Sequence, residues 1–279
     1  MIKKSKKRKY ILMKWLIKIF KRPRTIPVVR LDGVIGSSGQ FGSGGLEDSG
    51  LSSVLEKAFS FSRAKAIALI VNSPGGSPTQ SSLIASRVRR LSDEKNLPVF
   101  CFCEDVAASG GYWLACAGDE IYANENSIIG SIGVISSGFG FYEFISKQGI
   151  ERRIYTSGKE KSMLDPFKPE QKSDVARLKL IQKAIHHNFK TYVELRRGNK
   201  VQDKNIFTGE FWEARRALEL GLIDGLGNLE TVLRDKYGEN IEFKYVSRKK
   251  PLIARLSRSF SESIISTVMN RIYFSRYNL

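Results

Sequence analysis

The sequence predicts an α/β domain built on a mainly parallel sheet, because strand-like and helix-like patterns alternate along its middle part. The short continuous apolar runs AIALIVNS, 66–73, and VFCFC, 99–103, are typical of strands that are buried on both faces. A hydrophobic content of 42% is enough for a sizeable core, so the 279 residues suit one large domain with appendages.

The expected elements follow one another along the chain with glycine, serine and proline between them. The apolar run from Pro27 is the first strand, and a Gly/Ser loop, 37–45, follows it. The later elements are a helix over 46–60, a strand over 66–73, a helix to Lys95, a strand from Pro98, strands at 126–136 and 150–158 around a short helix at 141–148, a long helix over 168–198 ended by Gly198, and a helix from an N-cap at Thr208 to Gly221.

The net charge of +18 is concentrated at the two ends of the chain. Residues 1–25 contain 11 Lys and Arg and no acidic residue, and residues 248–279 contain 7 basic residues and one acidic residue. Residues 26–247 therefore carry a net charge of only +1, which argues against a nucleic-acid groove on the folded domain. We divide the chain into a basic N-terminal arm, 1–25, a folded domain, 26–247, and a basic C-terminal tail, 248–279.

Both end segments place apolar residues at helical spacing among their basic residues, as Trp15 and Ile19 do in the first and Leu256 and Phe260 in the second. The first apolar run is short and interrupted by lysines, so it does not suit a membrane span, and it lacks the small-residue cleavage site of a signal peptide. We predict amphipathic helices that lie on a membrane surface. A solvated tail and an arm that packs on a neighbouring subunit are the alternatives.

Two glycine-containing turns follow predicted strands, NSPGG at 72–76 and AASGG at 107–111. Functional groups collect at the carboxyl ends of parallel strands, and glycines let backbone N–H groups approach a ligand closely. Ser109 precedes a predicted helix, so its hydroxyl would be a nucleophile beside an oxyanion site. An N-cap serine in a tight turn is the alternative, and the nucleophile-elbow pattern G-x-S-x-G is absent.

A nucleophilic serine requires a base, and the histidines do not offer one. His186 and His187 are adjacent on one predicted helix and point about 100° apart, so we expect ordinary surface or partly buried histidines. A lysine is the other candidate where burial lowers the pKa of its amine. Lys159 and Lys161 lie in the glycine-containing loop YTSGKEKSMLDPF, 155–167, although a loop lysine alone is most often a solvated charge.

Four segments, NSPGG, VAASGGYWLA, GSIGV and YTSGKEKSMLDPF, in this order and spacing closely resemble the signal-peptide peptidase SppA/SohB family. The resemblance covers residues 26 to 240 and implies a ClpP/crotonase fold and a serine peptidase with a Ser-Lys dyad. It also implies an acyl-enzyme and no metal or organic cofactor. The stretch FTGEFWEARRALELGLID fits the family as well, with Glu210 at a place where a Gly-Arg pair is more usual.

The resemblance assigns a role to six residues of this chain. They are the nucleophile Ser109, the general base Lys161, the oxyanion-loop glycines Gly75 and Gly76, the second oxyanion donor Gly110, and Ser131, which would hydrogen-bond the lysine. Lys161 is read from the family pattern S-G-x-x-K, in which Lys159 fills a variable position.

The same resemblance implies peptide substrates, such as membrane-derived or remnant signal peptides, and a homo-oligomer in which neighbouring subunits contribute the serine and the lysine. We expect a membrane-associated protein on the cytoplasmic face of a bacterial inner membrane. This location suits Cys101 and Cys103, which share one face of a predicted strand and should be buried reduced thiols in a chain of three cysteines.

Two other functions stay open at this point. An acyl-CoA hydratase or isomerase of the same fold would use the glycine loop to bind a thioester oxyanion, but it gives Ser109 and Lys161 no role. A membrane-surface scaffold that has lost catalysis agrees with the basic ends of the chain, and the intact serine and lysine oppose it.

Overall fold

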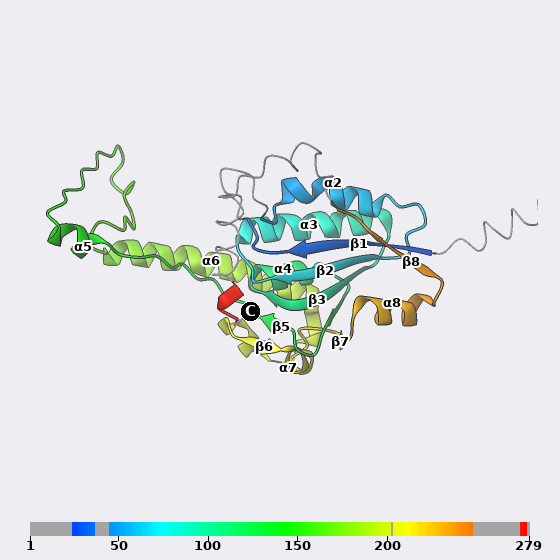
Figure 1. Ribbon diagram of the computed structural model, residues 1–279. Helices are drawn as coiled ribbons and strands as arrows, with labels where there is room; N and C mark the ends of the chain where they lie inside the picture. The colour runs from blue at the N-terminus through cyan, green and yellow to red at the C-terminus, as the bar shows by residue number, and fades with distance from the viewer. Residues whose placement is uncertain (1–23, 37–44, 202, 248–273, 278–279) are drawn as a thin grey trace, which may run out of the picture.

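The computed structural model describes residues 24–36, 45–201, 203–247 and 274–277. Most of the predicted N-terminal arm and C-terminal tail, with their expected amphipathic helices, lies outside the described residues. In Figure 1 a twisted sheet carries helices on both faces, and α5 and the start of α6 extend far beyond the body on one side.

A mainly parallel sheet forms the centre of the body. Its strand order is β6-β5-β3-β2-β1-β8, and β4 pairs with β3 and with β7. Of the pairings between described strands, only β5 with β6 is antiparallel. The strands are β1 (Arg24–Asp32), β2 (Ile67–Ser73), β3 (Val99–Ala108), β4 (Glu120–Ala123), β5 (Ile128–Gly130), β6 (Phe211–Glu213), β7 (Gly225–Leu226) and β8 (Ile241–Tyr245).

Helices cover the two faces of this sheet, as predicted for a mainly parallel α/β fold. The helices are α2 (Asp48–Phe59), α3 (Pro78–Lys95), α4 (Gly110–Ala115), α5 (Tyr142–Lys147), α6 (Lys172–Arg197), α7 (Ala214–Glu219) and α8 (Leu229–Tyr237), with the short 3-10 helices η1 (Gly198–Lys200) and η2 (Lys204–Thr208). Buried side chains of β2 and β3 alternate between two clusters. Leu69 and Cys101 pack toward α2 and α3, whereas Ala68 and Phe100 pack toward α8, which explains the unbroken apolar runs.

The cysteines are buried free thiols, as the sequence indicates. Burial raises the pKa of Cys101 and Cys103, and it raises the pKa of Cys116 to about 11. These thiols therefore remain protonated and act as small apolar side chains in the core.

The C-terminal half of α6 is fixed to the body by one buried arginine. Arg197 is 2% exposed and donates hydrogen bonds to the Gly221 carbonyl oxygen (2.9 Å) and to Asp224 (2.7 Å). Burial by itself would raise the pKa of Asp224, but hydrogen bonds from Arg197 and Lys200 outweigh it and hold that pKa below its ordinary value. The ion pair between Arg197 and Asp224 fixes the C-terminal end of α6 to the body.

Three local predictions are wrong. Residues 150–158 form no strand, because Ile150 and Tyr155 are exposed and the segment pairs with no strand among the described residues. Thr208 does not cap the next helix, since residues 211–213 first pair with β5 and Glu213 then caps α7 by accepting from the Arg216 N–H (2.8 Å). The first strand begins at Arg24, three residues before Pro27.

Candidate active site

Ser109 occupies a strained turn between β3 and α4. Its φ of 53° and ψ of −121° lie in a region that non-glycine residues rarely adopt. Hydrogen bonds over-determine this conformation, because the Ser109 N–H donates to the Gly130 carbonyl oxygen (2.8 Å) and its carbonyl oxygen accepts from the Trp113 N–H (3.0 Å). Ser109 is half-buried, and its hydroxyl is bonded to no described residue. The predicted N-cap alternative therefore lacks its side-chain hydrogen bond.

Helix α4 holds this turn rigidly against the core. The Tyr112 hydroxyl donates to the Leu222 carbonyl oxygen (2.7 Å), and the Trp113 ring stacks on Phe189 with ring centroids 4.7 Å apart. Both side chains are buried, so the first turn of α4 is anchored on α6 and on the segment after α7. A fixed backbone around Ser109 is what a preorganised site requires.

The loop after β2 brings Gly75 and Gly76 against Ser109. Backbone hydrogen bonds of 2.9 Å join this loop to Ile35 on both sides of Gly76, from the Ile35 N–H to the Gly75 carbonyl oxygen and from the Ser77 N–H to the Ile35 carbonyl oxygen. A Cβ on Gly75 would lie 2.8 Å from the Ser109 Cβ, and a Cβ on Gly76 would lie 2.8 Å from the Ile35 nitrogen. Both glycines have positive φ, so no larger residue fits this approach.

Near the Ser109 turn, the backbone N–H groups of Gly76 and Gly110 have no acceptor among the described residues. The Gly76 nitrogen lies 3.4 Å from the position that a Cβ of Gly110 would take, so the two residues are in contact. Gly75 differs, because its N–H donates to the Ser73 hydroxyl (3.2 Å). Paired N–H donors beside a serine hydroxyl can polarise a carbonyl group that the hydroxyl attacks.

Ser131 lies beside the same turn. It follows Gly130, is 3% exposed and has a φ of 52°. Its N–H donates to the Glu210 carbonyl oxygen (2.7 Å), and no described residue bonds to its hydroxyl. The structure thus brings Ser131 close to Ser109 and leaves its hydroxyl available.

Lys161 is far from Ser109 within one chain. It is exposed in residues 134–171, which we call the projection and which Figure 1 shows beyond the body together with the start of α6. Glu160, the residue before Lys161, forms an ion pair with Arg177 near the start of α6. His186 lies further along α6 and is 3.1 Å from the Ile132 carbonyl oxygen, close to the Ser109 turn. The stretch of α6 between Arg177 and His186 spans about 14 Å at roughly 1.5 Å per residue. The chain alone does not unite the serine and the lysine.

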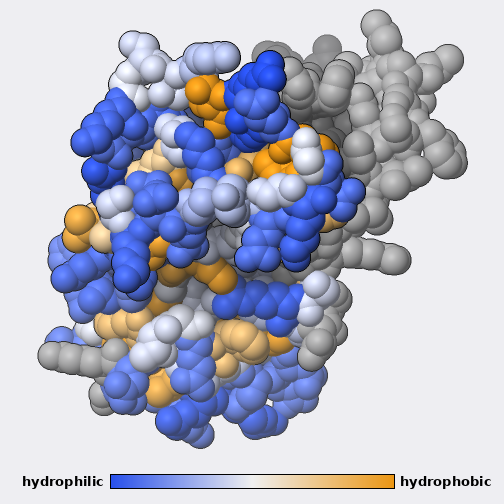
Figure 2. All heavy atoms as spheres, turned by 90° about the vertical axis from the view of Figure 1, so that its left-hand side faces the viewer, coloured by the Kyte–Doolittle hydropathy of each residue, from blue (hydrophilic) through white to orange (hydrophobic). Residues whose placement is uncertain are grey.

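The projection exposes large apolar side chains that a lone chain leaves in water. Phe139 is 82% exposed, Phe144 62% and Tyr155 91%. A hollow of 1450 Å³ lies between the projection and the start of α6, lined in part by Phe139, Phe141 and Met163. Figure 2 looks at the molecule from this side and shows apolar patches set among charged side chains. Large exposed apolar side chains that gather on one segment are typical of an interaction site.

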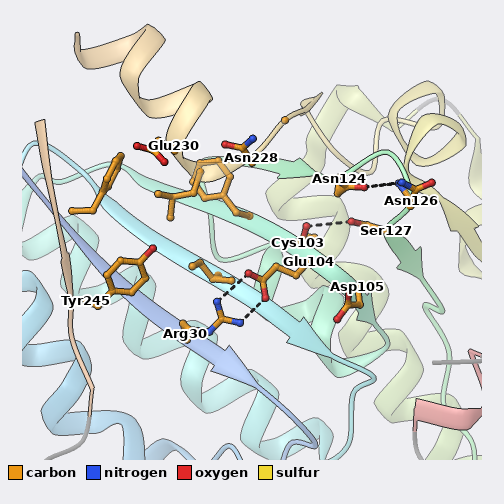
Figure 3. A pocket seen from close by; sticks show the side chains of 15 residues that line it. Arg30, Cys103, Glu104, Asp105, Asn124, Asn126, Ser127, Asn228, Glu230 and Tyr245 are labelled. Atoms are coloured by element: carbon orange, nitrogen blue, oxygen red, sulfur yellow. Dashed lines mark hydrogen bonds and ion pairs between the residues drawn. The ribbon is translucent and has the colours of Figure 1, made fainter. Parts of the chain in front are cut away.

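A second pocket, of 480 Å³, lies on the sheet near β1, β3 and α8 and is separate from the Ser109 turn (Figure 3). The carboxylate of Glu104 accepts two hydrogen bonds from Arg30, of 3.0 and 2.5 Å, and this contact raises the pKa of Arg30. Ser109 does not line this pocket.

Comparison with known proteins decides the family. The family model described as "Peptidase family S49" matches residues 92–239, which include the Ser109 turn and the projection. The chain belongs to peptidase family S49.

Two relatives and one solved structure illustrate the place of this S49 chain. A Brucella abortus protein that carries the name Na(+)/H(+) antiporter NhaA is 48% identical over 82% of this chain, and the match covers 31% of that protein. An Enterococcus faecium protein that is assigned the name signal peptide peptidase SppA is 32% identical over 61% of this chain and 49% of its own length. The S49 chain therefore spans less than two thirds of the length of these relatives, and each relative's name describes a longer protein than this chain.

The solved structure is a mutant of the 1510-N membrane-bound stomatin-specific protease in complex with a substrate peptide. It matches with a TM-score of 0.51 and 16% identity over 88% of this chain and 98% of that one. This likeness supports the ClpP-like fold of the S49 chain. Within the described residues, no helix has the length and apolar character needed to cross a bilayer.

The tight approach of the glycine loop yields a test of the site geometry. We expect Gly76→Ala to lower the free energy of unfolding by about 2–4 kcal/mol, because the added methyl group meets the Ile35 backbone at a positive φ. Gly138→Ala is the matched control, since no atom lies within 4 Å of its new Cβ. Urea unfolding measures both, and equal stability of the two variants would show that the loop does not approach Ile35 as described.

Proposed function

We propose that this chain is a serine peptidase in which Ser109 is the nucleophile and Lys161 of a neighbouring copy is the general base. The observation that carries the proposal is the strained Ser109 backbone, whose unbonded hydroxyl lies beside the free N–H groups of Gly76 and Gly110. Strained non-glycine residues persist only where the surrounding structure holds them, and they cluster at active sites. The S49 family match is consistent with this role.

The reaction begins when the neutral amine of Lys161 takes the Ser109 hydroxyl proton while the serine oxygen attacks the scissile carbonyl carbon. The Gly76 and Gly110 N–H groups stabilise the resulting oxyanion. The C–N bond then breaks, the amine product leaves with the proton from Lys161, and an acyl-enzyme remains. Water loses a proton to Lys161 and attacks the ester carbon. The bond from that carbon to the Ser109 oxygen then breaks, the serine oxygen takes the proton back from Lys161, and the acid product leaves. Ser131 would orient the lysine through its hydroxyl.

The projection provides the reason for placing the lysine on a neighbouring copy. Lys161 is exposed, and the surfaces around it carry Phe139, Phe144 and Tyr155, which assembly would bury. A contact from the projection of one chain to the Ser109 turn of the next joins two different surfaces, and such head-to-tail contacts form a ring where the rotation between neighbours closes. Each site of the ring would then receive its serine and its lysine from different chains.

The substrates we propose are membrane-derived peptides, including remnant signal peptides. The exposed aromatic residues of the projection would favour apolar chains, and one relative carries the name of a signal peptide peptidase. We further propose that the basic N-terminal arm, 1–25, and the basic C-terminal tail, 248–279, bring the assembly to an anionic membrane surface on its cytoplasmic side.

Mixing two inactive variants tests the shared site. Ser109→Ala and Lys161→Ala should each reduce peptide cleavage by roughly 10³-fold or more, because nucleophile and base act as a unit. When the two variants are dissociated and reassembled together, about a quarter of the interfaces should combine an intact serine with an intact lysine and recover that share of activity. Hydrolysis of a soluble fluorogenic peptide measures the recovery.

Lys159→Ala is the matched control for this experiment, since Lys159 lies on the same exposed loop and should be dispensable. Variants that stay inactive after mixing, while each still assembles, would place both groups in one chain. A hydratase of the same fold predicts a different result, namely that the two single variants keep full activity toward an enoyl thioester.

Deletion of the basic ends tests membrane binding. A chain that lacks the N-terminal arm, 1–25, and the C-terminal tail, 248–279, should no longer sediment with anionic liposomes, because each lost basic residue removes about 1 kcal/mol of attraction near the surface. Binding of the full chain should weaken as salt rises. Sedimentation of the truncated chain with these liposomes would contradict the assignment, and loss of the oligomer would instead assign the deleted segments to subunit packing.

A further inference from the structure

The pocket of 480 Å³ near β1, β3 and α8, which we call the α8 pocket, has an apolar floor (Figure 3). Ile70 and Phe102 pair across β2 and β3, and both are buried. Leu229 of α8 and Phe243 of β8 complete the apolar lining. This volume lies within the range of about 300–1,000 Å³ that is typical of ligand sites, so the α8 pocket has room for a ligand larger than a single side chain.

A bulge in β3 brings carboxylates into a strand that is otherwise buried. The pairing of β3 with β2 shifts after Cys103, so that Asn72 alone opposes residues 104–106. Glu104 and Asp105 of this bulge both line the α8 pocket, and Figure 3 shows the Glu104 carboxylate in the middle of the lining side chains. Bulges redirect side chains and are common beside functional sites. These acidic side chains therefore belong to the pocket and not to the core.

The charged groups of the α8 pocket have a net negative sum. Arg30 donates to both Glu104 and Asp32, and Glu230 at the start of α8 accepts from Arg234. Two arginines therefore stand against four carboxylates, a sum of −2, among the described charged side chains that line the pocket or bond to its lining, namely Arg30, Arg234, Asp32, Glu104, Asp105 and Glu230. Residues 26–247 as a whole carry +1, so this excess of carboxylates is local. Carboxylates attract a cationic group more strongly where apolar walls reduce the water around them.

Side-chain amides on the rim of the α8 pocket offer hydrogen-bond donors. The side-chain oxygen of Asn124 accepts from the Asn126 N–H (2.9 Å), and that of Asn228 accepts from the Thr231 N–H (3.0 Å). The side-chain NH₂ groups of Asn124 and Asn228 have no acceptor among the described residues, so each can donate to a ligand. Peptide carbonyl oxygens are acceptors of that kind. The apolar floor, the carboxylates and the amide donors together match a peptide that carries cationic and apolar side chains.

We propose that the α8 pocket binds a separate peptide in which lysine or arginine stands next to apolar residues. The methylene stem of the basic side chain lies on Phe102 and Leu229, and its charged end reaches Glu104 or Glu230. Adjacent apolar side chains of the peptide fill the rest of the floor. Membrane-derived peptides offer such stretches, since basic residues commonly flank an apolar segment. Ser109 does not line the pocket, so this binding does not depend on the proposed peptidase mechanism.

Binding of short labelled peptides to the full-length Ser109→Ala chain, which leaves the probe uncleaved, tests the inference. A rhodamine-labelled peptide KLFLK should bind about tenfold more tightly than QLFLQ, and ELFLE should not bind, because the carboxylates favour a cation. The affinity for KLFLK should fall as salt rises. Fluorescence anisotropy measures each dissociation constant. Equal affinity for the three peptides would overturn the inference, and so would no binding of KLFLK, including the case in which the chain's own basic ends fill the pocket.

Substitution of one carboxylate locates the binding. On the Ser109→Ala chain, Glu230→Gln should weaken KLFLK binding about threefold, because one attractive contact at an exposed rim is lost. Glu230→Lys should weaken it about tenfold, because it places a like charge there. Glu94→Gln is the matched control, since Glu94 also pairs with an arginine four residues away on its helix but lies on α3, outside the pocket. It should leave the affinity unchanged, and a loss equal to that of Glu230→Gln would overturn the inference, because binding would then follow the overall charge.

Photo-cross-linking gives the position of the peptide directly. A KLFLK analogue with benzoylphenylalanine in place of phenylalanine should label residues 102–105, 124–127 or 227–230, as read by mass spectrometry, and a label confined to other segments would overturn the inference. If Ser109→Ala abolishes peptide cleavage but the pocket takes up no label, this inference is wrong and the peptidase proposal stands. If the wild-type chain cleaves no peptide and the pocket is labelled, the inference stands and the peptidase proposal is wrong.

Discussion

The close approach of the Gly75–Gly76 backbone to Ile35 and to the Ser109 turn is the constraint on which the site depends. Two hydrogen bonds to Ile35 fix the loop, and the absence of side chains on both glycines lets it touch the serine. The same contact leaves the Gly76 and Gly110 N–H groups unpaired beside the hydroxyl. The strained serine and the free N–H donors therefore arise from one packing arrangement. Both depend on the strands that hold the glycine loop in place.

Lys161, which we propose as the base, lies away from Ser109 in the single chain for an equally physical reason. Arg197 and Asp224 anchor one end of α6 in the body, so the other end must project and carry Lys161 with it. Aromatic residues on the projection then remain in water. The contact with a neighbouring copy that we propose would complete the pair of Ser109 and Lys161 and would also cover the apolar side chains of the same segment.

The sequence predicts the interior of this fold well and its periphery poorly. Strands β2 and β3 are recognisable because burial on both faces demands continuous apolar runs, and the Ser109 turn stands out because close packing demands small residues there. Residues 150–158 show strand-like alternation, but a strand also needs a partner, which pattern alone does not reveal. The separation of Lys161 from Ser109 depends on tertiary packing, and no local signal encodes it.

The rate at which a fluorophosphonate labels Ser109 at a series of protein concentrations tests the central claim most directly, with mass spectrometry of the modified peptide as the readout. If Lys161 of a neighbouring copy activates Ser109, labelling per chain rises in step with assembly, and the Lys161→Ala chain stays slow at every concentration. Labelling of Ser109 that is equally fast in dilute monomer, or a label on another serine, would contradict the account.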